Sequence, residues 1–195
     1  MAKLNILPVD YPSGRLNELG DRLTDVFYPL IDDYAVLDER QIEPYLLHIV
    51  GNSPYLMADY FLNYLCSPKA LTLGVTSFPI DDKEHWVYGK GRKTGQACIS
   101  TGYNGIRDLE FNSNIHFEAV LNIGIHEIGH VFDLGHHDFI PKSTSSGLYC
   151  PMTTAHGRRV NQGQLLWDDY FAARDSSEFC VDCNTWLEKL ELIRA

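Results

Sequence analysis

The chain has 195 residues, 45% hydrophobic and 22% charged, which predicts one soluble domain over residues 1–195 with a core that needs no disulfides. Its formal net charge of −10 argues against nucleic acids and anionic membranes as partners, and we expect a monomer. No apolar run reaches about 18 residues and the first residues lack a signal-peptide pattern, so neither a membrane span nor export is expected.

The first predicted elements are a strand and two helices. Residues 4–9 are apolar and rich in β-formers, and apolar residues recur at helical spacing after Ser13, which can cap that helix. The Asn-Ser-Pro sequence at 52–54 predicts the start of a second helix that runs to about Cys66, because proline is favoured in the first turn.

The rest of the chain alternates further strands with two long helices. Residues 70–78 predict a strand, and residues 85–101 predict two strands around a glycine-rich basic turn. Residues 113–132 predict a long helix, and a loop-rich stretch from 139 leads to an amphipathic helix over 179–193. The predicted fold class is therefore α/β (α+β), a single compact domain with one mixed twisted sheet.

The motif with the clearest chemistry is H-E-x-x-H, formed by His126, Glu127 and His130. Four residues advance a helix by about 400°, so both imidazoles lie on one face and can reach one zinc ion. Glu127 lies about 100° round the helix, where it can act on a water beside the metal as general base.

A third ligand requires the helix to end. His136 follows His130 by six residues and would face away from the metal in a continuous helix. The chain must therefore turn near residue 133, where a positive φ is needed. Asp133 tolerates that conformation better than most residues, and Gly135 offers a second place to bend. The alternative is an amphipathic helix whose histidines only pack.

The five cysteines do not make a disulfide framework. Cys150, Cys180 and Cys183 cluster downstream of the histidines, which indicates metal binding in a reducing compartment, and we expect the cytoplasm. Cys66 and Cys98 lie in apolar stretches and are expected to be buried free thiols.

The pattern H-E-x-x-H-x-x-D-x-x-H resembles that of the metzincin zinc peptidases, which carry glycine in place of the aspartate. Within that clan the chain is most similar to the archaemetzincin family, through "CPM" at 150–152 and "CVDC" at 180–183. Earlier stretches are similar too: "NILPVD", "LTLGVTSFPI" and "WVYGKGRKTGQACIST". The resemblance thus covers most of the chain.

The resemblance implies two zinc ions and a methionine turn formed by Met152. The catalytic ion would be held by His126, His130 and His136. The structural ion of the family is held by four cysteines, the first directly after the third histidine, which is His137 here. The implied ligands of the second ion are therefore His137, Cys150, Cys180 and Cys183. Asp138 is a rival ligand or an outer hydrogen-bond acceptor, and the gaps around Cys150 are longer than the family's, so a lost second site is the alternative.

These residues predict a zinc peptidase in which a zinc-activated water attacks the peptide bond and Glu127 is the general base. The substrate would be a peptide or protein bound along residues 95–101, if that strand is an edge rather than an interior strand. His156 is the remaining histidine expected nearest the substrate. The alternatives are a non-catalytic zinc-stabilised module that binds a peptide or partner, and a zinc hydrolase acting on a non-peptide amide or ester.

Overall fold

The structure is a computed structural model that describes residues 2–12, 14–50, 53–65, 70–82, 85–102, 106–137, 143–153 and 177–194. Its strands are β1 (Ala2–Val9), β2 (Ile31–Val36), β3 (Leu47–Val50), β4 (Ser53–Met57), β5 (Leu71–Thr76), β6 (Ile80–Asp82), β7 (His85–Val87), β8 (Gly89–Arg92) and β9 (Gln96–Ser100). Its helices are α1 (Leu16–Phe27), η1 (Pro44–Leu46), α2 (Ala58–Tyr64), α3 (Asn114–Val131) and α5 (Val181–Arg194).

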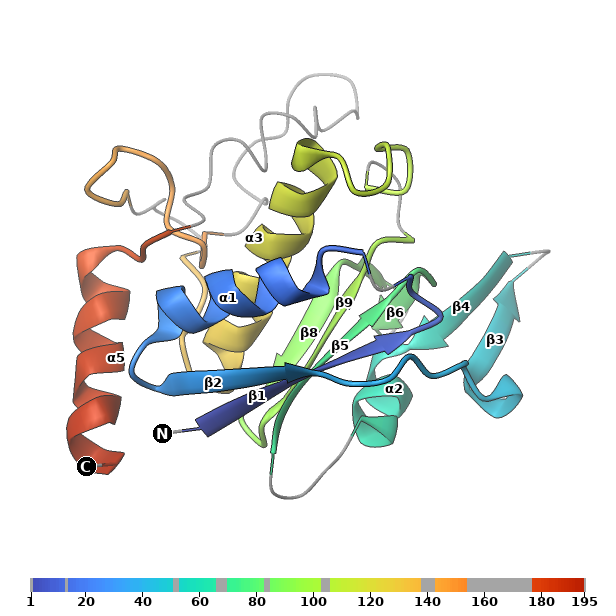
Figure 1. Ribbon diagram of the computed structural model, residues 1–195, viewed down its shortest axis with the longest axis horizontal. Helices are drawn as coiled ribbons and strands as arrows, with labels where there is room; N and C mark the ends of the chain where they lie inside the picture. The colour runs from blue at the N-terminus through green and yellow to red at the C-terminus, as the bar shows by residue number, and fades with distance from the viewer. Residues whose placement is uncertain are drawn as a thin grey trace.

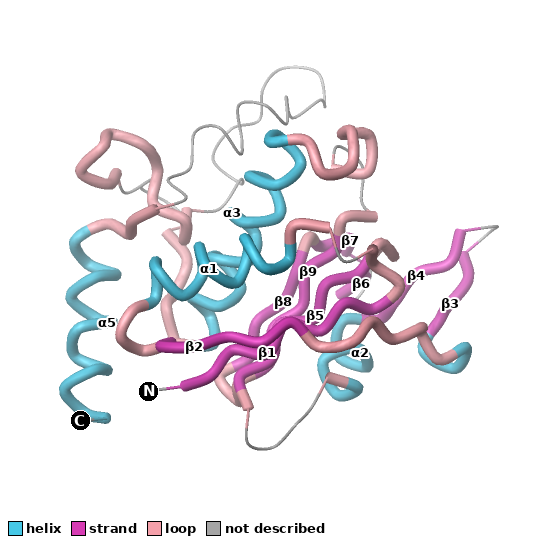
Figure 2. Tube along the Cα trace, viewed as in Figure 1, coloured by secondary structure: helices cyan, strands magenta, loops and turns pink. Residues whose placement is uncertain are grey.

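The larger sheet has the strand order β2-β1-β5-β9-β8 (Figures 1 and 2). Strands β2, β1, β5 and β9 run parallel, and β8 pairs antiparallel with β9. The predicted mixed sheet is therefore confirmed. The predicted basic turn lies between β8 and β9, where Gly95 has a φ of 99°.

A second sheet was not predicted. It consists of the four short strands β3, β4, β6 and β7. Strands β3 and β4 lie to the right of the larger sheet in Figure 1. The expectation of one sheet was wrong, because β6 pairs with β4 rather than continuing from β5 into the larger sheet. Strands of three to five residues carry too little periodicity to reveal this pairing in the sequence.

Helices cover both faces of the larger sheet. Helices α1 and α3 lie on one face and α2 lies on the other, while α5 stands beside the end of α1 (Figure 1). Each face has its own apolar cluster: Leu4 and Ile6 of β1 belong to the first, and Leu7 and Val9 to the second. Strand β5 is buried at every position, as expected for a parallel strand covered on both faces.

The helix predicted from residues 52–54 onward was partly wrong. Residues 53–57 form β4, and α2 begins only at Ala58. Pro54 fits the start of a strand as well as the start of a helix, and pairing with β3 and β6 decides between the two. Helix α1 begins after Arg15, and Ser13 lies outside the described residues.

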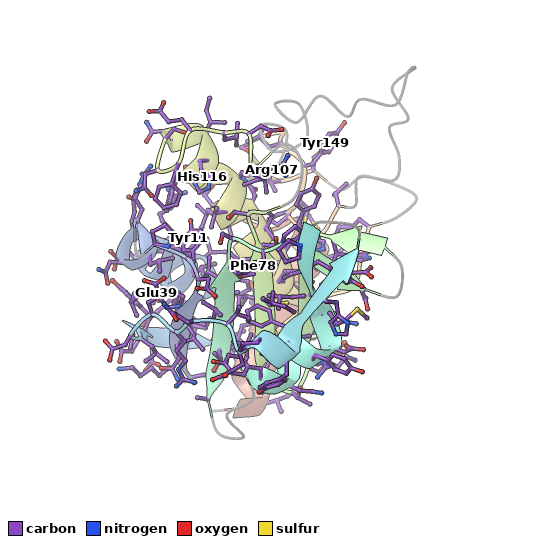
Figure 3. The ribbon with its side chains drawn as sticks, turned by 90° about the vertical axis from the view of Figure 1, so that its right-hand side faces the viewer. Tyr11, Glu39, Phe78, Arg107, His116 and Tyr149 are labelled. Carbon is purple, nitrogen blue, oxygen red and sulfur yellow. The ribbon has the colours of Figure 1, made fainter. Side chains whose placement is uncertain are left out.

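Helix α3 confirms the long helix predicted over 113–132. The Ser113 hydroxyl caps it by accepting a hydrogen bond from the His116 amide at 3.2 Å. The Phe111 ring lies edge-on to His116 and to Tyr11, with ring centroids 5.3 and 5.7 Å away. His116 is therefore a buried packing residue. Figure 3 labels His116 and Tyr11. None of the described helices combines the length and apolar character that a membrane span needs.

Candidate metal centres

Three histidine nitrogens converge at the C-terminal half of α3. The Nε2 atoms of His126 and His130 are 3.1 Å apart, and His136 Nε2 lies 3.1 and 2.8 Å from them. A tetrahedral zinc ion with nitrogen ligands at about 2.0–2.1 Å separates them by about 3.3 Å. The three imidazoles can therefore hold one zinc ion, as the motif predicted.

Two of these imidazoles have their other nitrogen fixed by the backbone. His126 Nδ1 lies 2.8 Å from the Pro151 carbonyl oxygen, and His130 Nδ1 lies 2.9 Å from that of Leu134. A carbonyl can only accept, so each Nδ1 carries the proton and each Nε2 presents a lone pair. Burial also lowers the pKa of His130, which favours its neutral form, although the Leu134 carbonyl opposes this. Fixed neutral tautomers are what a metal site requires.

The turn that returns His136 to this cluster has the predicted geometry. Asp133 has a φ of 66°, its amide donates to the His130 carbonyl at 3.1 Å, and the Leu134 amide donates to Gly129 at 3.0 Å. This is a Schellman motif with aspartate in the position usually taken by glycine. The Asp133 carboxylate also forms an ion pair with Lys93, in the turn between β8 and β9. The turn thus ends α3 and ties its end to the sheet.

Glu127 is buried between α3 and strand β8, with 6% of its surface exposed. A Cβ atom on Gly89 of β8 would lie 2.6 Å from Glu127 Cγ, and one on Gly91 would lie 2.1 Å from the Glu127 carbonyl oxygen. Glycine at both positions lets the strand backbone lie directly against the helix. Strand β8 therefore sets the position of the Glu127 segment, a role that the sequence analysis missed.

The predicted peptide-binding edge was wrong. Residues 95–101 contain β9, which pairs with β5 on one side and with β8 on the other. Both edges of β9 form hydrogen bonds to neighbouring strands, so β9 is an interior strand, which was the alternative prediction. Among the described strands β8 pairs only with β9, and it is the edge strand beside Glu127.

Met152, the residue predicted to form a methionine turn, packs against Gly129 of α3, one residue before His130. It is fully buried, and a Cβ atom on Gly129 would lie 2.6 Å from its sulfur. The Met152 carbonyl accepts a hydrogen bond from the His137 amide at 3.0 Å. One short turn therefore supports both His126, through the Pro151 carbonyl, and the segment that carries His137.

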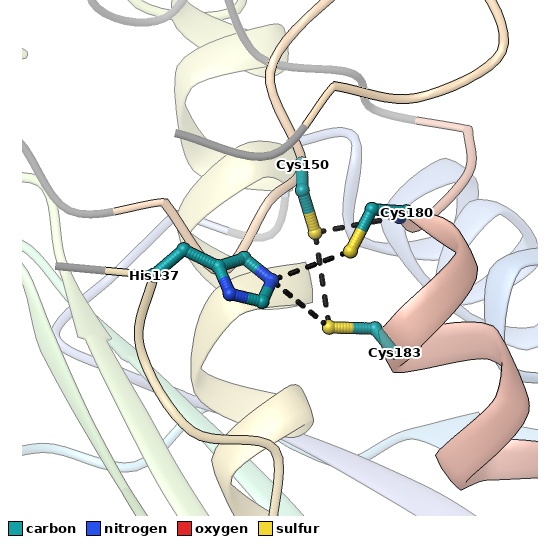
Figure 4. A group of neighbouring side chains, drawn as sticks. All are labelled: His137, Cys150, Cys180 and Cys183. Carbon is teal, nitrogen blue, oxygen red and sulfur yellow. Dashed lines mark hydrogen bonds between the residues drawn. The ribbon is translucent and has the colours of Figure 1, made fainter. Parts of the chain in front are cut away.

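A second cluster brings together the four residues implied for the structural zinc (Figure 4). His137 Nε2 lies 3.3 Å from both Cys180 Sγ and Cys183 Sγ, and Cys150 Sγ lies 3.9 Å from Cys183 Sγ. Thiolates at about 2.3 Å from a tetrahedral zinc are about 3.8 Å apart, so this spacing fits the ion. The structure thus brings His137 together with the three cysteines named with it in the sequence.

Cys150 is the cysteine of this cluster that ionises most readily, because the pKa values of Cys180 and Cys183 are raised. The Cys183 thiol lowers the pKa of Cys150, and burial raises it in part. The Cys180 amide, which donates to Cys150 Sγ at 3.5 Å, also lowers this pKa. The thiolate is the form that binds metal. Cys98, by contrast, is fully buried and its pKa is raised by burial, so it is the inert thiol that the sequence predicted. Cys66, Asp138 and His156 lie outside the described residues.

No protein-family model and no curated protein matches this sequence. Solved structures do match it. An archaemetzincin from Archaeoglobus fulgidus, complexed with malonate, has a TM-score of 0.65 and 21% identity over 94% of this chain and 99% of its own. An archaemetzincin from Methanopyrus kandleri has a TM-score of 0.68 and 22% identity over 96% and 94%. A zinc-dependent peptidase from Methanocorpusculum labreanum has a TM-score of 0.60 and 17% identity over 94% and 99%.

The chain has the archaemetzincin fold. This agrees with the resemblance drawn from the motifs, and it accounts for nearly the whole chain. The archaemetzincin fold also explains why residues far apart in the sequence meet at the two clusters: α3, the turn at 133–137, the turn at 150–153 and α5 converge there.

The archaemetzincin pattern did not reveal the backbone groups and glycines that shape the site. The Pro151 and Leu134 carbonyls carry no side-chain signal, so no sequence pattern could have found them. The alternation of glycine and basic residues in "GKGR", residues 89–92, was a signal that the sequence analysis did not use. A period of two predicts a strand with one face free of side chains.

Proposed function

We propose that this protein is a zinc-dependent peptidase of the archaemetzincin type, with His126, His130 and His136 as the ligands of the catalytic ion. The main support is the convergence of their three Nε2 atoms, with His126 and His130 oriented by backbone carbonyls. The archaemetzincin fold and the buried Glu127 on the same helix support the same reading.

The ligand set favours catalysis over a purely structural site. Within the described residues this cluster has three histidines, whereas closed structural sites have four protein ligands. When bound, zinc supplies Lewis acidity that makes water a nucleophile near neutral pH. Glu127 accepts the proton of the attacking water and returns it to the amine that leaves. Together, the attack of the water on the carbonyl carbon, the loss of the amine and these proton transfers hydrolyse a peptide bond.

We further propose that the substrate peptide extends along β8. The unpaired edge of this strand offers main-chain donors and acceptors to a peptide, and Gly89 brings it against Glu127. The scissile carbonyl would then lie near both the general base and the histidines. In the proposed site β8 thus has two roles: its outer edge binds the peptide, and its glycine face packs against Glu127.

The second cluster is proposed to hold a structural zinc, which gives two ions per chain. Its ligands are His137, Cys150, Cys180 and Cys183, a set suited to a closed tetrahedral site. Three thiolate ligands persist in a reducing compartment, so we propose that the enzyme works in the cytoplasm.

Metal counting and a peptide-library assay test the proposed function together. The wild-type protein is expected to contain two zinc ions and to cleave peptides. Glu127→Gln should keep both ions and lose about 10²- to 10⁴-fold in turnover, the usual contribution of a general base. His126→Ala is expected to lose one ion. Wild-type turnover in Glu127→Gln would overturn the general-base assignment.

The same assay separates the alternatives. Cleavage of esters or other amides without any peptide cleavage would identify a different zinc hydrolase. A zinc-loaded protein that binds peptides and cleaves none would identify a binding module instead.

A further inference from the structure

Strand β8 has two chemically different faces. Its sequence, Gly-Lys-Gly-Arg over Gly89–Arg92, alternates with the period of a strand. Gly89 and Gly91 lie against α3, where a Cβ atom on either would collide with Glu127. The side chains of Lys90 and Arg92 therefore project on the opposite face, away from the proposed catalytic site.

The basic face of β8 is held by carboxylates from the second sheet and from α2. Lys90 Nζ donates to Asp59 Oδ1 at 3.0 Å and to Asp82 Oδ1 at 2.8 Å. Arg92 Nη2 donates to Asp59 Oδ1 at 2.6 Å, and its Nη1 donates to Asn63 Oδ1 at 2.7 Å. Asp59 is the carboxylate that contacts both basic residues. It joins the first turn of α2 to the edge strand of the larger sheet.

The charges in this network support one another. Arg92 and then Lys90 lower the pKa of Asp59 through hydrogen bonds to its carboxylate. Burial alone would lower the pKa of Lys90, yet Asp82 and Asp59 raise it overall. Asp59 and Lys90 therefore both stay charged near neutral pH. About a quarter of each basic side chain and 43% of the Asp59 side chain are exposed, so the network is partly screened by solvent.

Strand β8 has three neighbours: it pairs with β9, its glycine face packs on α3, and its basic face meets this network. It is four residues long, and its described strand pairing is with β9 alone. Because so short a strand has few backbone hydrogen bonds, the network supplies the side-chain part of its support. Any shift of β8 is transmitted directly to Glu127, because the glycine face leaves no space between strand and helix.

We propose that Asp59 is a positioning residue for the peptidase site. By holding Lys90 and Arg92, it fixes β8 so that the strand can pair with a substrate peptide and support Glu127. This inference rests on the proposed function. It adds a residue about 70 positions before the H-E-x-x-H motif that nothing in the motif identifies.

The variant Asp59→Asn tests this proposal, because it removes the charge and keeps the side-chain shape. Peptide KM is expected to rise about fivefold or more, as a displaced edge strand pairs less well with its substrate. A smaller folded fraction would lower kcat and leave KM unchanged, so the KM rise distinguishes positioning from simple destabilisation. The melting temperature and the zinc content should stay close to those of the wild type.

Two further variants serve as controls. Asp33→Asn removes a carboxylate that pairs with Lys3 at 2.8 Å on the opposite edge of the sheet, and it should leave KM unchanged. Arg92→Gln breaks the same network from β8 without touching α2, and it should reproduce the KM rise. Combined with Asp59→Asn it should add little, because residues of one network are not additive.

Amide hydrogen exchange tests the positioning without any activity. Exchange in residues 89–92 of Asp59→Asn is expected to accelerate about tenfold or more relative to the wild type, while β1 and β5 keep their protection. Unchanged exchange in β8, or an unchanged KM, would overturn the proposal. If the wild type cleaves no peptide, the proposed function fails, and the exchange measurement still decides whether Asp59 positions β8.

Discussion

Asp133 performs a backbone task that the metzincin pattern gives to glycine. Its φ of 66° lies in the left-handed region, where most residues are strained but aspartate and asparagine are tolerated. The two hydrogen bonds of the Schellman motif fix this conformation, so the position of His136 depends on the residue at 133. The sequence predicted a positive φ near residue 133, with Gly135 as a second place to bend, because a continuous helix would turn His136 away from the metal.

Substitution at position 133 should therefore change zinc affinity at the histidine cluster. Asp133→Val places a β-branched side chain in the left-handed region, which costs about 1–2 kcal/mol and should weaken zinc binding there. Asp133→Gly should bind zinc at least as tightly as the wild type. Competition with a chelator measures both affinities.

Lys93→Met is the control for the ion pair at position 133. The pair is 70% and 47% exposed, so its loss should change zinc affinity little. Equal affinity in Asp133→Val and the wild type would show that the turn does not depend on this conformation.

His116 links a single buried side chain to the pH dependence of stability. Burial lowers its pKa from the ordinary value of 6.5, so the folded protein takes up a proton there less readily than the unfolded chain. The stability that neutral, buried His116 contributes is complete above pH 6.5. It is lost as the pH falls below that value, because the unfolded state then binds more protons than the folded state.

The prediction is that stability falls from pH 7.5 to pH 5.5 more steeply in the wild type than in His116→Gln. Urea unfolding of both zinc-free proteins at the two pH values measures the difference. The metal-binding histidines contribute equally to both proteins and cancel. Parallel pH profiles would show that His116 is not the group responsible.

Among the elements, the sequence predicted best where periodicity is long. Strand β1 and helices α3 and α5 have eight or more residues each, and their apolar patterns matched the structure. Residues 53–64 were partly mispredicted because five strand residues are followed at once by a seven-residue helix. Neither segment is long enough for its pattern to outweigh the proline at position 54.

The sequence predicted the candidate metal ligands but not the order of the strands that surround them. The H-E-x-x-H spacing and the archaemetzincin resemblance predicted His126, His130 and His136 as ligands of one ion, and their Nε2 atoms do converge. The assignment of β9 as an edge was wrong, since strand order depends on pairings between residues such as Thr72 and Gln96 that lie far apart in the chain. Sequence periodicity identifies a strand's faces, but not its neighbours.

In the molecule as a whole, the cluster of His137 and three cysteines joins α5 to the rest of the chain. The apolar cluster on the α2 face of the larger sheet consists entirely of residues between Leu7 and Cys98. Helix α5, by contrast, is held near its start by Cys180, Cys183 and the Trp186 hydrogen bond to the Phe132 carbonyl. Its far end is solvated, with Leu192 and Ile193 both 80% exposed. The anchoring of α5 therefore lies in its first half, at the second cluster and at Leu187, which packs in the main apolar core.

Zinc removal should consequently affect the two parts of the molecule differently. After chelation, amide exchange in residues 177–194 is expected to accelerate strongly, because a structural zinc contributes folding free energy only to what its ligands join. Strands β1 and β5 should keep their protection. Cys180→Ser provides the matched comparison: it should accelerate exchange in α5 and lose one zinc ion while the histidine cluster keeps its own. Uniform loss of protection after chelation would mean that the core also depends on zinc, and unchanged exchange in α5 would mean that the second cluster does not anchor it.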